Sequence, residues 1–371
     1  MRIGIDANPM LGDCGGVGWL TYYLLRALVA LKDDVEFVAY VKPGSLVNGG
    51  LEDWPRLTQL RWVEAGLWTM RWRGTLDHLD LYHGTNFKLK TEGRYGGVVT
   101  IPDLWLDRHP QYSRKAFGQR SSFYRGRRTA WRARKVITIS QHSAQDIMSL
   151  YGLPRERISV IPCGVSEEFR PSRDPGALED LRRRIGLKSD KYILFLGGAG
   201  PRKNHATLVE AFATRAEQLK SYTLVLVGDG VHRFGSYLRT VRAHGLEAQV
   251  LCPGRLCFED LRSLYSGAEL FVFPSIYEGF GMPVLEAMAC GAPVITSNTT
   301  SLPGVAGDAA ILVNPFDARE LGEAMVRVLS DVKLRESLRA RGFERAKHFT
   351  WERTAQRTLE VYRELCAMNP A

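Results

Sequence analysis

The chain has 371 residues, of which 45% are hydrophobic and 24% are charged, a composition typical of a globular protein with more than one domain. No stretch approaches the roughly 18 apolar residues of a membrane-spanning helix, and the six cysteines form neither a CxxC pair nor a zinc-like cluster with histidine. The formal net charge of +10 favours an anionic partner, such as a nucleotide, a lipid headgroup or a nucleic acid.

The N-terminal residues predict a first strand, glycine loop and helix. A strand pattern at 3–5 is followed by a glycine-rich loop at 12–18 and by an apolar helical pattern at 20–31. Gly16, in that loop, lets the backbone approach a bound group closely, so we place it in the binding site. Because the chain enters a strand directly, without a signal peptide, we expect it to stay in the reducing cytoplasm.

Two later strands end at polar residues that are candidates for a binding site. His83 ends a strand predicted at 81–83, and Asp103 follows a strand predicted at 98–101. For His83 we favour a buried structural role. For Asp103 two roles stay open, namely binding a substrate hydroxyl and capping a helix or turn.

The segment 114–135 is strongly basic. Its nine basic residues, with no acidic one among them, are Arg114, Lys115, Arg120, Arg125, Arg127, Arg128, Arg132, Arg134 and Lys135. Phe117, Tyr124 and Trp131 recur every seven residues, which places them on one face of a helix. Either this helix binds an anionic membrane surface, or its aromatic face packs on the core and its cations are solvated. The sequence WTMRWR at 68–73 repeats the combination and favours the membrane.

A link between two domains is predicted in the middle of the chain. Residues 162–165 and the charged, proline-containing stretch up to about Asp190 have the composition of a connection between domains. We place the boundary near Gly164.

A second strand, glycine loop and helix follow this link. The strand pattern at 192–196 leads into the loop 197–204, which ends with Arg202, Lys203 and an Asn204 helix cap. Cationic side chains on such a loop can hold a phosphate group. A solvated basic turn is the alternative.

The most specific motif is SIYEGFGMPVLE at 275–286, which directly follows an apolar strand pattern. Pro283 suits the first helical position, so we expect Glu278 in the loop and Glu286 in the first turn. Both carboxylates would face the crevice at the carboxyl end of a parallel strand, where open α/β sheets bind nucleotides. The backbone N–H groups that could meet an anion there belong to Phe280, Gly281 and Met282. An ordinary helix start, with glutamate favoured by the helix dipole, is the alternative.

This segment, continued without a gap through 287–295, resembles the Glu-x7-Glu signature of retaining glycosyltransferases of family 4, also called glycosyl transferases group 1. The sequence is similar in style to bacterial O-antigen and exopolysaccharide mannosyltransferases. The resemblance implies the GT-B fold, an α/β architecture of two facing Rossmann-like domains with parallel sheets. We therefore expect an acceptor-binding domain at 1–164, a nucleotide-sugar donor-binding domain at 165–350, and a C-terminal helix at 351–371 that crosses back to the first domain.

The resemblance also implies roles for single residues. Lys203 and Arg202 would hold the donor diphosphate. Glu278 would contact the donor sugar and Glu286 the nucleotide ribose, since carboxylates should face neutral hydroxyls and not the diphosphate. The catalytic candidates are Glu278, Lys203 and Asp103. The donor-binding candidates are Gly16, Arg202, Lys203, Arg255, Glu278, Gly279, Phe280, Gly281, Met282 and Glu286.

Three departures from the family pattern put some roles in doubt. The histidine that commonly precedes the position of Asp103 in relatives is Pro102 here. An arginine that many relatives carry after the strand at 192–196 is replaced by a pair of glycines at 197–198, so Arg202 would have to take its role. Gly304 stands where relatives often have glutamate, which argues against catalysis by that position.

We expect a retaining hexosyltransferase that moves mannose from GDP-mannose to a hydroxyl of a growing, lipid-linked glycan. No cofactor and no metal are expected, because no Asp-x-Asp cluster lies beside the donor loops. The expected partners are the nucleotide sugar, the glycan acceptor and an anionic membrane surface at the inner face of the cytoplasmic membrane. The alternatives are a nucleotide-sugar epimerase or a phosphorylase on the same fold, and a basic nucleic-acid-binding protein.

Overall fold

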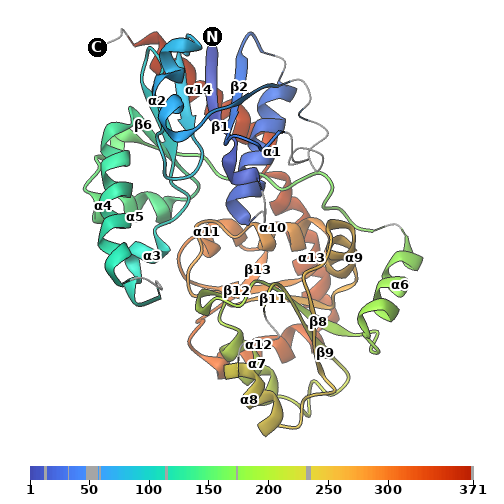
Figure 1. The fold of residues 1–371 in the computed structure, drawn as a ribbon. Helices are drawn as coiled ribbons and strands as arrows, with labels where there is room; N and C mark the ends of the chain where they lie inside the picture. The colour runs from blue at the N-terminus through green and yellow to red at the C-terminus, as the bar shows by residue number, and fades with distance from the viewer. Residues whose placement is uncertain are drawn as a thin grey trace. The chain divides into compact units, whose positions relative to one another are not determined.

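The computed structural model describes residues 1–11, 15–31, 33–46, 57, 60–112, 116–172, 174–230 and 235–368. The chain divides into two compact units, one of residues 1–164 with 350–371 and one of residues 165–349 (Figure 1). The division falls directly after Gly164, and the C-terminal helix belongs to the first unit. The first part of the predicted glycine loop, 12–14, lies outside the described residues.

The first unit is built on a seven-stranded parallel sheet in the order β3-β2-β1-β4-β5-β6-β7. The strands are β1 (Arg2–Asp6), β2 (Glu36–Val41), β3 (Arg61–Glu64), β4 (Leu81–Gly84), β5 (Gly97–Thr100), β6 (Lys135–Thr138) and β7 (Ile158–Val160). Most of their residues are buried on both faces of the sheet, which is why these segments are almost continuously apolar.

Helices cover both faces of this sheet. They are α1 (Gly16–Ala30), α2 (Leu67–Leu76), α3 (Trp105–Arg108), α4 (Ala116–Arg132), α5 (Gln141–Tyr151) and α14 (Trp351–Ala367). Met70 of α2, Ala130 of α4 and Ile147 of α5 share one buried cluster. The connection from β1 through α1 to β2 runs toward the β3 edge of the sheet, whereas the connections through α2, α4 and α5 run toward the β7 edge. Because such connections between parallel strands are right-handed, α1 covers the other face. There the Trp351 ring of α14 stacks on Tyr23 of α1, with the ring centroids 5.4 Å apart.

His83 links the C-terminal helix to the sheet. Its Nδ1 lies 2.6 Å from the Tyr362 hydroxyl of α14, and its Nε2 lies 2.7 Å from the Thr100 hydroxyl of β5. The imidazole is fully buried, and burial lowers its pKa to about 3. The predicted structural role of His83 is therefore confirmed.

The second unit has a six-stranded parallel sheet in the order β10-β9-β8-β11-β12-β13. The strands are β8 (Tyr192–Leu196), β9 (Thr223–Val227), β10 (Val250–Gly254), β11 (Leu270–Phe273), β12 (Val294–Ser297) and β13 (Ala310–Val313). The helices are α6 (Pro175–Ile185), α7 (His205–Ala213), α8 (Gly235–Ala243), α9 (Phe258–Gly267), α10 (Met282–Ala289), α11 (Leu302–Ala306), α12 (Ala318–Ser330) and α13 (Val332–Lys347). The strand order reverses between β8 and β11, and ligands bind at such a point in open α/β sheets.

The stretch predicted to be a link contains a helix. In α6, the side chain of Asp174 accepts hydrogen bonds from the N–H groups of Gly176 and Ala177, and Gly186 ends the helix at φ +75°. This helix packs against α9 of the second unit. The prediction of a link as far as Asp190 is therefore wrong, although the N-cap, proline and glycine signals of a helix are all in the sequence.

The basic segment forms α4, and its aromatic residues do not line the core. Tyr124 is 62% exposed and Trp131 is 45% exposed. The core side of the helix consists instead of small residues, Gly126 and Ala130, with Phe123 partly buried. The interpretation of a core-facing aromatic face is wrong for these two rings. The side chains of Arg114, Lys115, Phe117 and Arg120 lie outside the described residues.

Candidate donor-binding site

Two loops of the second unit meet at the carboxyl end of its sheet. One follows β8 and includes a 3-10 turn, Pro201–Lys203, and the other leads from β11 to α10. The strands β8 and β11 are direct neighbours, so their carboxyl ends lie side by side. The N–H of Ile276 donates a hydrogen bond of 2.9 Å to the carbonyl of Arg202, which fastens the loops together.

Glu278 lies between the two cations of the β8 loop. Its Oε1 is 2.7 Å from Lys203 Nζ, and its Oε2 is 3.3 Å from Arg202 Nη1. The Lys203 ammonium also lies 4.6 Å from the centre of the Phe273 ring. The structure thus brings together three residues that the sequence predicted to be a donor site. Both carboxylate oxygens of Glu278 face these cations, and a contact of Glu278 with hydroxyl groups of the donor stays a prediction.

The charges of this cluster decide its ionisation. Burial alone would raise the pKa of Glu278, but the nearby charges of Lys203 and Arg202 bring it below its ordinary value. The carboxylate is therefore ionised at neutral pH. Two cations and one anion leave a formal charge of +1, which can attract a phosphate group.

Hydroxyl groups after β12 hold the Glu278 loop in place. The N–H of Glu278 donates to the Thr300 hydroxyl at 3.1 Å. The Ser301 hydroxyl lies 2.8 Å and 2.7 Å from the carbonyls of Glu278 and Phe280, and Thr299 donates to Ile276. This role of the three hydroxyl residues was not predicted from the sequence. A run of three hydroxyl residues after a strand of the same sheet was the signal that could have suggested it.

Asn204 occupies the predicted cap position of α7, but its side chain has a different task. Its Nδ2 donates to the carbonyl of Pro274 at 3.0 Å and to that of Pro315 at 2.6 Å. These carbonyls follow β11 and β13. Asn204 therefore fixes the β8 loop against two neighbouring loops and positions the adjacent Lys203.

Glu286 lies on α10, close to the same edge of the sheet. Gly281 precedes the helix at φ +113°, Pro283 is its second residue, and Glu286 is its fifth. Glu286 is therefore in the second turn of the helix, and the prediction that it lies in the first turn is wrong. Its Oε2 accepts a hydrogen bond of 3.2 Å from the Tyr265 hydroxyl, and burial raises its pKa to about 7.

Comparison with known proteins identifies the family. Residues 14–169 match the model described as Glycosyltransferase Family 4, and residues 179–345 match the one described as Glycosyl transferases group 1. The chain is 32% identical over 303 residues to an O-antigen chain mannosyltransferase B of Escherichia coli, across 80% of this chain and 77% of that protein. The chain is a family 4 glycosyltransferase.

Two further comparisons extend this result. A serotype-specific mannosyltransferase WbdA of Escherichia coli is 34% identical over 238 residues, which are 63% of this chain and 29% of that longer protein. The structure of sucrose-phosphate synthase from Thermosynechococcus elongatus superposes with a TM-score of 0.78 at 24% identity, covering 99% of each chain. At this identity the likeness concerns the fold alone. It agrees with the predicted GT-B class, in which each of two Rossmann-like domains has a parallel sheet.

The remaining predicted residues of this glycosyltransferase lie at other positions. Arg255 is exposed and directly follows β10, beyond Gly254 at φ +84°. Gly16 is the first residue of α1, in the first unit. Asp103, also in the first unit, accepts a hydrogen bond of 3.0 Å from the N–H of Trp105. Asp103 therefore caps a turn, which was one of its two predicted roles, and its role toward a substrate stays a prediction.

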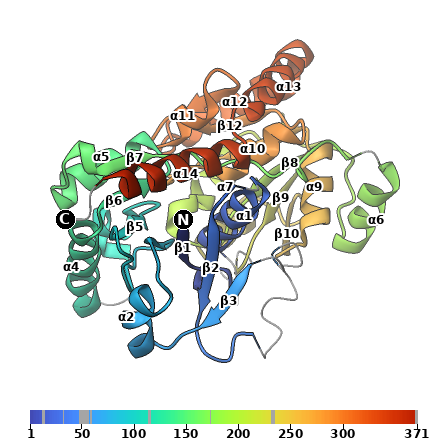
Figure 2. The same ribbon diagram turned by 90° about the horizontal axis from the view of Figure 1, so that it is seen from above.

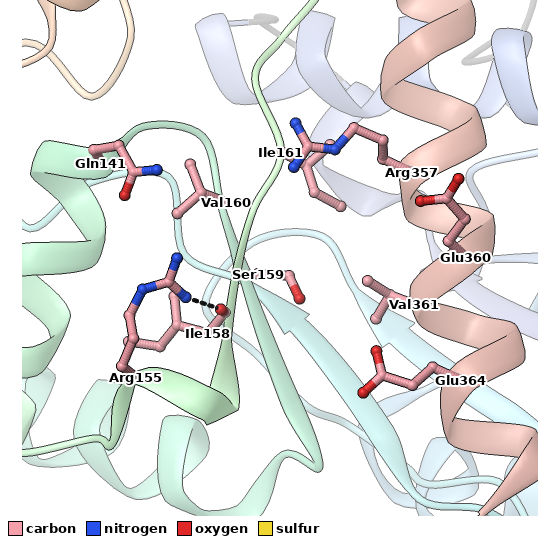
Figure 3. Close-up of a pocket in the computed structure, with 10 residues that line it drawn as sticks. All are labelled: Gln141, Arg155, Ile158, Ser159, Val160, Ile161, Arg357, Glu360, Val361 and Glu364. Carbon is pink, nitrogen blue, oxygen red and sulfur yellow. Dashed lines mark hydrogen bonds between the residues drawn. The ribbon is translucent and has the colours of Figure 1, made fainter.

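The first unit of the glycosyltransferase has a pocket of about 330 Å³ beside its edge strand β7 (Figure 3). Arg155 and Gln141 line one side, and Arg357, Glu360 and Glu364 of α14 line the other. The pocket is lined by charges of both signs and by none of the residues predicted for the site.

The described part of the chain was also compared with what a metal site and a membrane-spanning helix require. No cluster of three or more His, Cys, Asp or Glu side chains suited to a metal ion is found there. Among its helices, none combines the length and the apolar character needed to cross a membrane. Metal independence stays a prediction.

Proposed function

We propose that this glycosyltransferase is a retaining mannosyltransferase that uses GDP-mannose and extends a lipid-linked glycan. The observation that carries the proposal is the cluster of Lys203, Arg202 and Glu278 on two adjacent loops, in a chain related to an O-antigen mannosyltransferase over most of its length. The choice of mannose rests on the names of that relative and of the WbdA protein. The choice of a guanine nucleotide follows from the resemblance of the sequence to O-antigen mannosyltransferases.

Lys203 and Arg202 would neutralise the diphosphate. Their side chains are partly exposed at the carboxyl end of the sheet, so a phosphate oxygen can approach them while Glu278 keeps them in position. The first N–H groups of α10, around Met282, would add the positive end of a helix dipole. Such preorganised groups stabilise the negative charge that grows on a leaving phosphate.

The two glutamates would hold the sugar and the ribose. The Glu278 carboxylate can share the cations with the phosphate and accept a hydrogen bond from a donor sugar hydroxyl. Glu286 would accept hydrogen bonds from the ribose, which favour its ionised form. Gly279, Phe280 and Gly281 connect the two and would let backbone approach the donor, and Arg255 would contact the base or a phosphate.

In the proposed reaction the bond between the anomeric carbon and the phosphate oxygen breaks, and a bond to the acceptor oxygen forms on the same face of the sugar. The acceptor proton passes to the leaving phosphate oxygen, so that no enzyme-bound sugar is formed. Asp103, with Gly16 of the first unit, would contact the acceptor or the donor. No metal ion or cofactor takes part in this scheme.

We further propose that the acceptor is carried on a lipid and that the protein works in the cytoplasm, at the inner face of the cytoplasmic membrane. The name of the O-antigen relative supports a glycan acceptor. The net charge of +10 supports attraction to an anionic surface.

The deciding experiment measures turnover of GDP-mannose, GDP-glucose, UDP-glucose and UDP-galactose, first as hydrolysis in water and then as transfer to lipid-linked acceptors. GDP-mannose should be preferred, and nuclear magnetic resonance of the product should show retained anomeric configuration. Glu278→Gln and Lys203→Ala should each lower turnover on the order of 10²-fold. Glu323→Gln removes an exposed carboxylate of the same unit and is the matched control. Preference for a UDP-sugar would overturn the donor, and near-normal turnover in both variants would overturn the site.

A further inference from the structure

The outer face of α2 is unusually apolar for a surface helix. Trp68 is 78% exposed and Trp72 is 68% exposed, and Leu67 and Leu76 at the two ends of the helix are 76% and 64% exposed. Trp68, Trp72 and Leu76 are spaced by four residues, so they form one stripe along the helix. Burying such large side chains would normally stabilise a protein, and leaving them in water needs an explanation.

The packing of α2 fixes this stripe on the outside. Met70 and Gly74 form the opposite face and are buried. A Cβ atom at Gly74 would lie 1.7 Å from the carbonyl oxygen of Glu92, so the helix backbone rests directly on that loop. The Gly74 N–H also donates to the Thr91 hydroxyl at 3.2 Å. The helix cannot turn its indole rings inward without breaking this contact.

The outer face of α4 continues the same kind of surface. Tyr124 and Trp131 are exposed, and Arg125 and Arg128 are exposed next to them on the helix. The Trp131 indole donates to the carbonyl of Tyr151, which holds the ring in place. No side-chain partner of Arg125 or Arg128 is found among the described residues.

The two helices lie on the same side of the first unit, as both views show (Figures 1 and 2). Met70 of α2 and Ala130 of α4 bury into the same cluster. The loop with Glu92, on which Gly74 of α2 rests, also meets α4, because Arg132 forms an ion pair of 2.6 Å with Glu92. We call the outward-facing set the aromatic-basic surface. It comprises Leu67, Trp68, Arg71, Trp72, Leu76, Tyr124, Arg125, Arg128 and Trp131.

We propose that the aromatic-basic surface docks on an anionic lipid bilayer, with the α2 stripe inserted at the level of the headgroups. Indole rings suit that level, because one part of the ring is apolar and its N–H can meet water or headgroups. The arginines attract anionic headgroups before and after insertion. Leu67 and Leu76 add apolar area at both ends of the stripe, as expected for a surface that enters lipid.

The charge of this surface argues against a second copy of the chain as its occupant. A symmetric contact of the surface with itself would bring Arg71, Arg125 and Arg128 close to the same arginines of the other copy. Like charges facing each other in an interface cost free energy. A bilayer containing phosphatidylglycerol supplies the opposite charge and the apolar layer together.

This inference deepens the proposed function, in which the acceptor is carried on a lipid, but its test needs neither donor nor acceptor. The full chain is mixed with vesicles of phosphatidylcholine, with or without phosphatidylglycerol, and bound protein is measured by co-sedimentation. Quenching of tryptophan fluorescence by lipids brominated along their chains reports insertion. Hydrolysis of the soluble donor is measured in parallel, so a failure of docking and a failure of catalysis are seen separately.

Two pairs of substitutions separate the apolar and the electrostatic contributions. Trp68→Ser with Trp72→Ser should weaken binding to anionic vesicles by about 100-fold, roughly tenfold for each ring removed from the bilayer. Phe316→Ser, at a 68% exposed ring of the second unit, is the matched control and should bind like the parent. Arg125→Glu with Arg128→Glu should weaken binding most at low salt, since charges are screened over about 8 Å at physiological ionic strength. The matched control for the arginine pair is Lys220→Glu with Lys333→Glu, which changes the net charge by the same amount at exposed residues of the second unit.

The outcomes decide the proposal directly. Binding that needs phosphatidylglycerol, is lost in the tryptophan pair, and leaves donor hydrolysis unchanged would support it. Parent protein that stays in solution with anionic vesicles would overturn it, as would equal binding by the tryptophan pair. A concentration-dependent dimer that the tryptophan pair abolishes, seen by sedimentation in the absence of lipid, would also overturn it in favour of a second copy.

Discussion

Removing the Lys203 side chain tests the ion-pair cluster more sharply than activity alone. Lys203→Ala takes away the ammonium 2.7 Å from Glu278 and leaves Arg202, at 3.3 Å, as the remaining cation. Breaking a buried ion pair by removing one partner costs about 3–5 kcal/mol. Because Arg202 still compensates part of the Glu278 charge, we expect a loss of about 2 kcal/mol. For a unit of this size that loss corresponds to a fall of about 4–8 °C in the unfolding midpoint.

The assay is thermal unfolding of the full chain without nucleotide, for Lys203→Ala, Glu278→Gln and the double variant. Glu278→Gln removes the buried negative charge, so the additional loss of Lys203 should then cost much less. The double variant should therefore be more stable than Lys203→Ala alone. If Lys203→Ala lowers the midpoint equally in the presence and absence of Glu278→Gln, the two side chains are not coupled and the reasoning is refuted.

Other predictions concern pH, backbone geometry and metal. Burial raises the pKa of Glu286 to about 7, so about one tenth of this side chain is ionised at pH 6. The affinity for GDP, measured by calorimetry and divided by that of the Glu286→Gln variant, should therefore rise with pH through 7 and be about tenfold lower at pH 6 than well above pH 7. A constant ratio between the two proteins would contradict a ribose contact by the ionised carboxylate. Burial lowers the pKa of His83 to about 3 in the folded protein, against about 6.5 in the unfolded chain. The contribution of the neutral imidazole to protein stability is therefore complete above pH 6.5 and falls as the pH drops from about 6.5 toward 3. The urea midpoint of His83→Gln should change less between pH 7 and pH 5 than that of the parent protein. An equal change in both proteins would argue that His83 does not carry this pH dependence. Gly281→Ala should cost about 1–3 kcal/mol in denaturant unfolding, because Gly281 has φ +113° and a Cβ there would lie 2.7 Å from Leu302; an unchanged midpoint would show that the loop adapts. Turnover should survive EDTA, and loss that magnesium or manganese restores would reveal a metal requirement.

Local signals in the sequence were sufficient for the architecture and for most of the candidate donor site. Strands and helices could be recognised because each has its own hydrophobic period. Their alternation along the chain predicted parallel sheets, since a helix then connects each strand to the next parallel one. The loops with Lys203 and Glu278 were found because glycine, proline and charged residues follow apolar strands directly. In parallel sheets such loops gather at one edge, so their proximity could be predicted without coordinates.

The tertiary structure decided which groups meet and which faces stay in water. Lys203 and Glu278 are 75 residues apart, and their pairing depends on β8 and β11 being neighbours in the sheet. The hydroxyl groups of 299–301 reach the Glu278 loop only because β12 lies beside β11. A helical pattern places Tyr124 and Trp131 on one face but does not say what covers that face. Small residues on the opposite side of α4 let that side approach the core more closely, so the rings of Tyr124 and Trp131 stay exposed. The sequence by itself had left open whether this aromatic face is buried or exposed.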